Sequence, residues 1–183
     1  MGIKGKIIST CVMIALTLCS AVAIGFAYSN PGINISSPTS FNVDDGVQAS
    51  VSTTIAINGE NVDLENGVGS LTIEADSSES SYDLDLPKQV FTKIGDKIVY
   101  TYTITNTKTD SVGSDFIIGL SLNSPSESLA NSVSITSSFS ELSADEKLLT
   151  KGESVSITFT LELLSESTSF DFDPSIQFTL TKA

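Results

Sequence analysis

Strict alternation of apolar and polar residues along several short segments constrains this chain more than any other feature. Residues 97–106 place Ile98, Tyr100, Tyr102 and Ile104 on one side and three threonines on the other. Residues 154–163 repeat the pattern, with apolar residues at every second position. Successive side chains of a β-strand point to opposite faces, so each segment predicts a strand with one buried face.

The same alternation recurs along most of the chain after its first part. It is present in residues 32–36, 40–43, 47–57, 69–75, 115–122, 131–137 and 175–180. Strands with one polar face are typical of antiparallel sheets covered on one side only. Seven to nine such strands predict an all-β fold, an antiparallel two-sheet sandwich, preceded by an N-terminal signal helix.

Two segments depart from this pattern. The acidic segment 76–88 is predicted to be a loop because polar residues cluster there. Ser143 and Glu146 have capping-box spacing and predict one helical turn. Residues 28–183 show no sign of a second domain, so a single sandwich is expected there.

The first 27 residues have the layout of a secretory signal. Lys4 and Lys6 precede the apolar run 7–24, and the small residues Gly25 and Ala27 follow it. This order predicts export and cleavage near Ala27 by a signal peptidase. The alternative is an uncleaved anchor, because the run is about long enough to span a bilayer. We therefore expect a secreted, extracellular or cell-surface protein that meets the membrane only through this segment.

The positions of the two cysteines and the excess of acidic residues narrow the class of protein further. Cys11 and Cys19 both lie within the predicted signal, so the mature chain has no thiol and no disulfide. Without Lys4 and Lys6, seven basic residues face 22 acidic ones. Such a surface repels nucleic acid and anionic membranes, which excludes nucleic acid as a partner.

The residues that most catalysis requires are missing. The chain contains no His, and its only cysteines precede residue 28. His-dependent triads and His-based zinc sites are therefore excluded, and no Gly-rich phosphate loop is present. We expect no enzymatic activity and no cofactor, with Ca²⁺ as the one candidate ligand.

Three acidic pairs are the candidate Ca²⁺ ligands, because carboxylate oxygens suit this ion. Residues two apart on a strand point to the same side, which favours the second and third pairs. None of the pairs matches a complete calcium loop, and solvated charge that protects strand edges is the alternative. The pairs are Asp44 with Asp45, Asp83 with Asp85, and Asp171 with Asp173.

Residues 94–107 contain a motif that resembles one found in a known family of proteins. Gly95 and Asp96 form a turn, Tyr100 lies inside the strand, and Asn106 closes it. This layout resembles a strand of Ig-like modules in bacterial surface proteins. With residues 151–153 leading into a later strand and "IGFAYS" ending the signal, the chain is similar to the secreted TasA/camelysin type.

That resemblance implies a signal processed by a SipW-type peptidase, a single sandwich of the Ig-like or jelly-roll kind, and a role as a fibre or biofilm-matrix subunit. It also implies assembly by donation of an N-terminal strand to the next copy or to a related surface protein. Metalloprotease activity, linked to camelysin-like proteins, is not carried over because the chain has no His.

The donated strand corresponds to residues 30–43, within a region 28–45 that is either a donor or an ordinary first strand. Short apolar alternation suits a strand that completes a neighbour's sheet. The assembly candidates are Ile33, Ile35, Phe41 and Val43.

Three hypotheses for function follow from these observations. The first is a structural surface or matrix protein that self-associates. The second is an adhesin or ligand-binding module that uses loops at one end of the sandwich, with or without Ca²⁺. The third is a membrane-tethered surface domain that keeps its signal. The threonine face of residues 97–106 is expected to be solvent surface, with recognition or stacking in a fibre as alternatives.

Overall fold

The computed structural model describes residues 33–123, 131–165 and 171–183. The predicted signal, its cleavage site at Ala27 and residues 28–32 lie outside the described residues. Residues 33–183 form one compact unit dominated by strands, with little helix. Within the described ranges, no helix has the length and apolar character needed to cross a membrane.

One layer of the fold is a six-stranded sheet in which every pairing is antiparallel. Its order is β10-β12-β8-β3-β4, and β5 also pairs with β3. The bounds are β10 Val133–Ser137, β12 Ser154–Leu163, β8 Lys97–Asn106, β3 Ala49–Ile57, β4 Glu60–Asn61 and β5 Ser70–Ile73.

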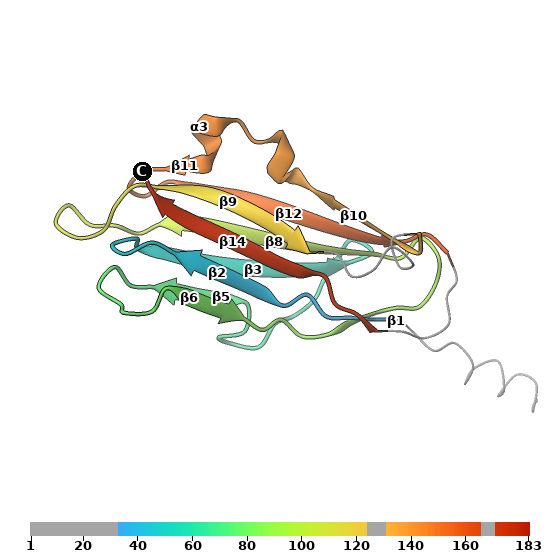
Figure 1. Cartoon of the computed structure of the whole chain (residues 1–183). Coiled ribbons are helices and arrows are strands. Elements are labelled where there is room, and N and C mark those ends of the chain that lie inside the picture. The colour runs from blue at the N-terminus through green and yellow to red at the C-terminus, as the bar shows by residue number, and fades with distance from the viewer. Residues whose placement is uncertain (1–32, 124–130, 166–170) are drawn as a thin grey trace, which may run out of the picture. The chain divides into compact units, whose positions relative to one another are not determined.

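The facing layer is a five-stranded sheet in the order β11-β9-β14-β2-β6 (Figure 1). A smaller sheet, β13-β1-β7, lies at the ends of β2 and β14. The bounds are β11 Leu148–Leu149, β9 Phe116–Asn123, β14 Ser175–Lys182, β2 Thr39–Val43, β6 Ser81–Leu84, β13 Asp171–Phe172, β1 Ile33–Ile35 and β7 Gln89–Phe91.

Two strand pairings are parallel, one in the five-stranded sheet and one in the three-stranded sheet, which a wholly antiparallel sandwich does not contain. β2 runs parallel to β14, and β1 runs parallel to β13. The first strands of the chain therefore lie beside its last strands and point in the same direction. Parallel neighbours need no hairpin between them, so no local turn signal in the sequence marks this arrangement.

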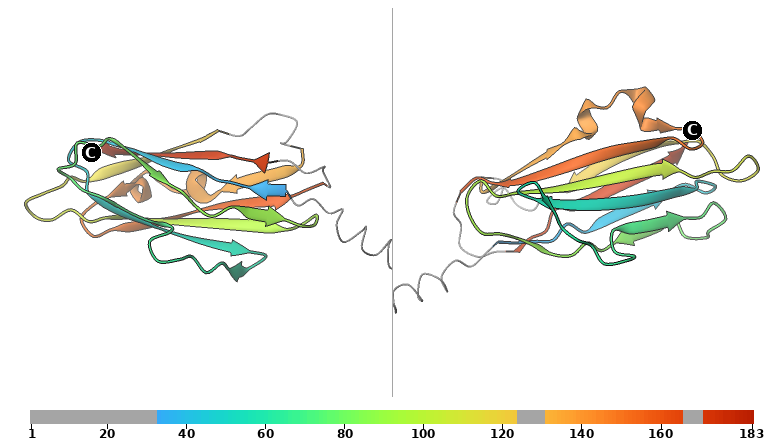
Figure 2. Two further views of the ribbon diagram at one scale, coloured as in Figure 1. Left: turned by 90° about the horizontal axis from the view of Figure 1, so that it is seen from below. Right: turned by 180° about the vertical axis from the view of Figure 1, so that it is seen from behind.

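The two layers of strands lie one above the other in the left view of Figure 2, and their inward side chains form one apolar core. The alternation in β8 and β12 predicts the buried faces correctly, since Ile98, Ile104, Ile157 and Leu161 are all buried. Four aromatic rings meet between the layers, with centroids 5.0 to 6.2 Å apart. They are Phe41, Tyr102, Phe159 and Phe178.

The predicted loop 76–88 is wrong in part, because it contains β6. The reason is that Leu84 turns inward and is buried, while β2 offers a free edge to which β6 pairs antiparallel. The predicted helical turn is confirmed as α3, Ala144–Lys147, which follows a short 3₁₀ turn η1, Ser138–Glu141. The Ser143 amide donates to Glu146 Oε2 at 2.7 Å, which completes the capping box.

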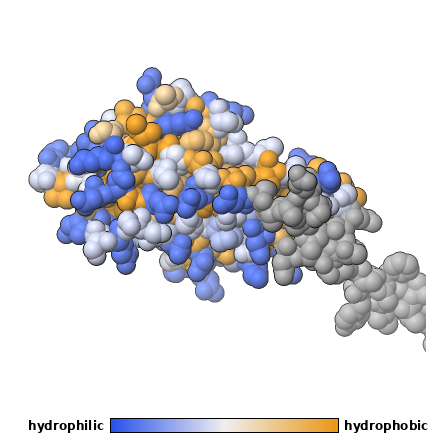
Figure 3. Space-filling view, in the orientation of Figure 1, coloured by the Kyte–Doolittle hydropathy of each residue, from blue (hydrophilic) through white to orange (hydrophobic). Residues whose placement is uncertain are grey.

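Apolar residues are visible at several places on the face shown in Figure 3, with the largest group around β9 and β11, while polar residues cover much of the region over β2 and β6. Ile117 and Leu122 of β9 are among the exposed large apolar residues. The exposed outer surface of β2 is thus polar, and its apolar side chains face the core.

Candidate functional site

The N-terminal segment, residues 33–43, fills a slot within the sandwich of its own chain. Every odd-numbered side chain of this segment is buried, and the row continues through the break at Pro38 between β1 and β2. β1 lies between β13 and β7, and β2 lies between β14 and β6. The assembly candidates Ile33, Ile35, Phe41 and Val43 therefore all belong to the core of this chain.

The middle of the buried row is polar. The Thr39 hydroxyl lies 2.7 Å from the hydroxyl of Tyr102 in β8 and donates to the Ser37 carbonyl at 3.2 Å. With that donation made, the Thr39 oxygen accepts from the Tyr102 O–H. Burial raises the pKa of the Tyr102 hydroxyl well above its usual range, although the bond to Thr39 opposes the shift. The bond joins the two layers of the sandwich directly.

The ends of the row are apolar and closely packed. Phe41 stacks on Phe178 of β14, with ring centroids 5.0 Å apart and an interplanar angle of 12°. Tyr102 packs against the same Phe178 ring at 5.3 Å. Aromatic contacts of this kind contribute about 0.5–1.5 kcal/mol beyond the area they bury. The N-terminal segment is thus held by core packing and by one buried side-chain hydrogen bond, in addition to the backbone pairing of β1 and β2 with their neighbours.

A tight turn, residues 44–46, connects the N-terminal segment to β3. The Val47 amide donates to the Asp44 carbonyl at 3.2 Å, and Gly46 has φ of 82°. A positive φ of this size suits glycine and strains other residues. The Asp44 carboxylate accepts from the Lys182 amide at 3.0 Å, which ties the turn to the end of β14. We call residues 44–46 the hinge.

The six candidate Ca²⁺ ligands are dispersed over the described structure. Asp44 and Asp45 lie in the hinge, and Asp44 already accepts the Lys182 amide. Asp83 and Asp85 are exposed beside a shallow groove next to β2, and Asp173 is exposed. Asp171 contributes its backbone to β13. Among the described residues, no three or more acidic side chains gather as a metal site would need.

Asp96, from the motif at the start of β8, anchors that end of the strand. It is only 2% exposed. Its carboxylate accepts from both the amide and the hydroxyl of Thr92, from the Lys93 amide and from the Asn58 side chain, all at 2.8 to 3.0 Å. Burial alone would raise the pKa of Asp96, but these hydrogen bonds outweigh it and lower the pKa to about 2.

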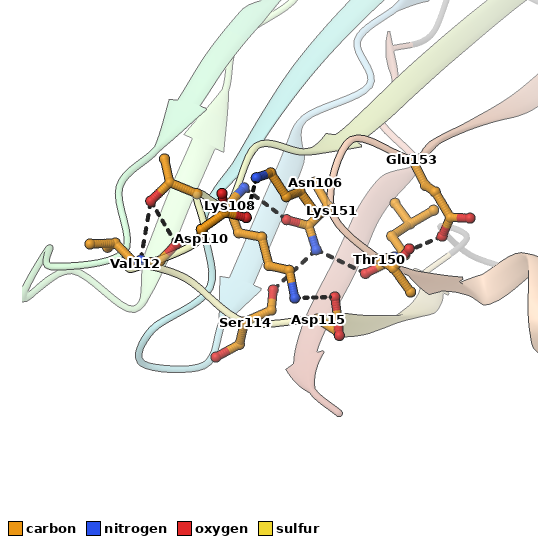
Figure 4. Close-up of polar contacts among 11 residues, drawn as sticks. Asn106, Lys108, Asp110, Val112, Ser114, Asp115, Thr150, Lys151 and Glu153 are labelled. Atoms are coloured by element: carbon orange, nitrogen blue, oxygen red, sulfur yellow. Dashed lines mark hydrogen bonds and ion pairs between the residues drawn. The ribbon is translucent and has the colours of Figure 1, made fainter.

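Asn106, the last residue of the motif, anchors the opposite end of β8 (Figure 4). Its fully buried side chain donates to the carbonyls of Ser114 and Leu149 at 3.0 and 2.8 Å and accepts from the Lys108 amide at 2.9 Å. Around it, Lys108 pairs with Asp115 at 2.6 Å, and Lys151 pairs with Asp110. The motif residues therefore hold loops in place at both ends of one strand.

The threonine face of β8 is an ordered hydroxyl surface. Thr103 and Ser156 hydroxyls lie 3.0 Å apart, and those of Thr105 and Ser154 lie 2.7 Å apart. Lys97 pairs with Glu162 at 3.1 Å near one end of this face. These cross-strand pairs link β8 to β12 and identify no ligand.

The contact between Thr39 and Tyr102 is not among the features that the sequence predicts. One signal was available, because the period-two row of residues 33–43 continues through Ser37 and Thr39. A threonine at an inward position of a predicted strand indicates a buried partner for its hydroxyl. The partner itself is 63 residues away in the sequence, and no local pattern identifies it.

Comparisons with known proteins identify no family for this chain and only a distant likeness in structure. No protein-family model and no curated protein sequence matches it. A mutant form of the major pilin from Streptococcus pyogenes is a similar solved structure, with 12% identity over 82% of this chain and a TM-score of 0.25. The chain spans about half of the pilin chain, 48%. A TM-score this low supports no conclusion about function.

Proposed function

We propose that this protein is a secreted, non-enzymatic structural component of a bacterial cell surface or biofilm matrix. Its copies associate by exchanging the N-terminal segment, residues 33–43. The observation that carries the proposal is the position of this segment: it fills a slot inside the core, yet only the short connection 44–48, which includes the hinge, leads from it to β3.

Exchange of the segment needs no new contacts. If the hinge opens, the segment of one copy enters the slot of the next copy. There it makes the same hydrogen bonds and packing contacts that it makes within its own chain. The free-energy difference between closed and exchanged forms is then small, and protein concentration decides between them. A chain of such exchanges builds a fibre, because each copy both gives and receives a segment.

The acidic surface favours this route over association through exposed faces. The whole chain has a net charge of −13, so two copies repel one another over most of their surfaces. The inward row of the N-terminal segment carries no charge. Its transfer between copies therefore buries apolar and hydroxyl groups without burying carboxylates.

A pair of engineered cysteines tests exchange directly. Ser40 of β2 and Asp83 of β6 are register partners. The bond from the Val43 amide to the Ser80 carbonyl places them at a position without hydrogen bonds, where Cα atoms are about 4.5 Å apart and a disulfide fits. In a chain with Cys11 and Cys19 replaced by serine, Ser40→Cys with Asp83→Cys reports which copy supplies β2.

Assembled protein oxidised at this pair is expected to run as covalent multimers on a non-reducing gel. The matched control is Thr103→Cys with Ser156→Cys, whose positions are partners within β8 and β12 of one copy. The control is expected to give monomers from the same assemblies. If both cysteine pairs give monomers on the gel although the samples scatter light as large particles, that result would contradict exchange of the segment.

A further inference from the structure

The slot that holds the N-terminal segment has a polar centre between apolar ends. The buried row runs apolar, hydroxyl, apolar from its first residue to its last. In order it reads Ile33, Ile35, Ser37, Thr39, Phe41 and Val43.

β8 presents a matching polar centre from the other layer. Tyr102 is 0% exposed and Thr39 is 2% exposed, so both residues are buried in the core. Their 2.7 Å contact satisfies the tyrosine within the core. A buried hydroxyl that loses its only partner typically shifts an equilibrium by roughly tenfold or more against the structure that strands it.

Shifting the segment by two residues along the slot, which moves each inward side chain to the next inward position, breaks the match between Thr39 and Tyr102 in either direction. If Phe41 moves opposite Tyr102, the tyrosine O–H has no acceptor. If Ser37 moves there, Thr39 takes the place of Phe41 and the stack on Phe178 is lost. The polar centre therefore fixes the register of the segment, in addition to its alternation.

We propose that Tyr102 selects the strand that occupies the slot, by requiring a side-chain hydroxyl opposite its own. The inference rests on the proposed exchange where the strand comes from another copy, but it applies equally to the chain's own segment. The partner that fits is a strand of a second copy, or of a related chain, with Thr or Ser at the fourth inward position. The inward rows of β12 and β14 are apolar throughout, so the same requirement rejects them.

Capture of competing peptides tests the selection. The acceptors are full chains carrying Asp83→Cys, with Cys11 and Cys19 replaced by serine, and either Tyr102 or Tyr102→Phe. The competing peptides span residues 33–43, carry Ser40→Cys, and differ only at Thr39 or Thr39→Val. Both peptides displace the same resident segment, so the ratio of the two disulfide products depends only on how well each fits.

The acceptor with Tyr102 is expected to capture the threonine peptide about tenfold over the valine peptide. The Tyr102→Phe acceptor is expected to lose or reverse that preference, because valine then faces an apolar ring. A peptide with Asn42→Ala, which changes an outward side chain, is the control and should be captured as well as the unchanged peptide. Equal ratios in both acceptors would overturn the selection.

Unfolding of four full-length chains separates this inference from the proposed function. Thr39→Val and Tyr102→Phe are each expected to reduce the folding equilibrium constant, and the double variant should recover about tenfold relative to additivity. If neither peptide is captured, the proposed exchange between copies is contradicted. The coupling between Thr39 and Tyr102 in the unfolding experiment then decides by itself whether Tyr102 selects the strand. Coupling below twofold would overturn it.

Discussion

β2 and β8 are both central strands with alternating buried faces, but they are held in different ways. β8 pairs antiparallel with two long neighbours, and buried polar side chains, Asp96 and Asn106, anchor its two ends. β2 has five residues, runs parallel to β14, and reaches β3 through the hinge. An inward apolar pattern thus decides where a strand can lie, while the strand's length and its anchored ends decide whether it stays in place.

Removing the anchor at the start of β8 should have the largest effect. Asp96→Ala leaves the amides of Thr92 and Lys93 and the Asn58 side chain without their acceptor. We expect a loss of about 3–4 kcal/mol in the free energy of unfolding, because hydrogen bonds to a charged group are strong. Urea unfolding measures it, with the exposed carboxylate variant Asp85→Ala as control. A loss below about 1 kcal/mol would refute the anchor.

Removing the other anchor should have the next largest effect. Asn106→Ala strands the buried carbonyls of Ser114 and Leu149, and we expect a loss of about 2–3 kcal/mol. Asn61→Ala, which removes an exposed amide from β4, should change stability by less than about 0.5 kcal/mol. Equal losses for the two variants, in the same urea experiment, would show that burial of Asn106 does not matter.

Acid should weaken the Asp96 anchor without a mutation. The pKa of this carboxyl is about 2 in the folded chain, below its usual 3.8. The unfolded chain therefore binds the proton first, and stability from this group is lost as pH falls from about 4 toward 2. Urea unfolding between pH 6 and pH 2 should show a steeper decline for the wild type than for Asp96→Asn. Parallel curves would contradict the lowered pKa.

The sequence predicts the parts of this fold whose signal is local. The alternation in β8, β12 and β14 identifies their buried faces, and the spacing of Ser143 and Glu146 identifies the capping box. The parallel pairing of β2 with β14 is not local, because it depends on which strand edges meet after folding. β6 lies in the segment that the sequence predicts to be a loop, because its acidic, serine-rich surroundings obscure the inward Leu84.

The candidate site was predictable to a similar extent. Ile33, Ile35, Phe41 and Val43 follow from the alternation, although it cannot say which copy's core they enter. The contact between Thr39 and Tyr102 depends on the distance between two layers, which no spacing in the sequence encodes. The acidic pairs were recognisable as carboxylates, but convergence of ligands is a property of the fold.

Changing the outer face of β8 should have the smallest effect. Thr103→Val removes the hydroxyl that lies 3.0 Å from Ser156, at a solvent-accessible position. Valine keeps the strand propensity and water replaces the lost bond, so we expect a change within about 0.5 kcal/mol. Urea unfolding against Ser156→Ala checks this. A loss above 1 kcal/mol would mean that the hydroxyl face, and not only the anchored ends, holds β8.

Hydrogen exchange of backbone amides tests the difference between β2 and β8 most directly. We expect amides within β2 to exchange through local release of the N-terminal segment, at least about tenfold faster than the amides of β8. The amides of β8 should exchange only when the whole sandwich unfolds. Equal protection of the two strands, at the level set by global unfolding, would contradict the claim that the segment can leave its slot while the rest stays folded.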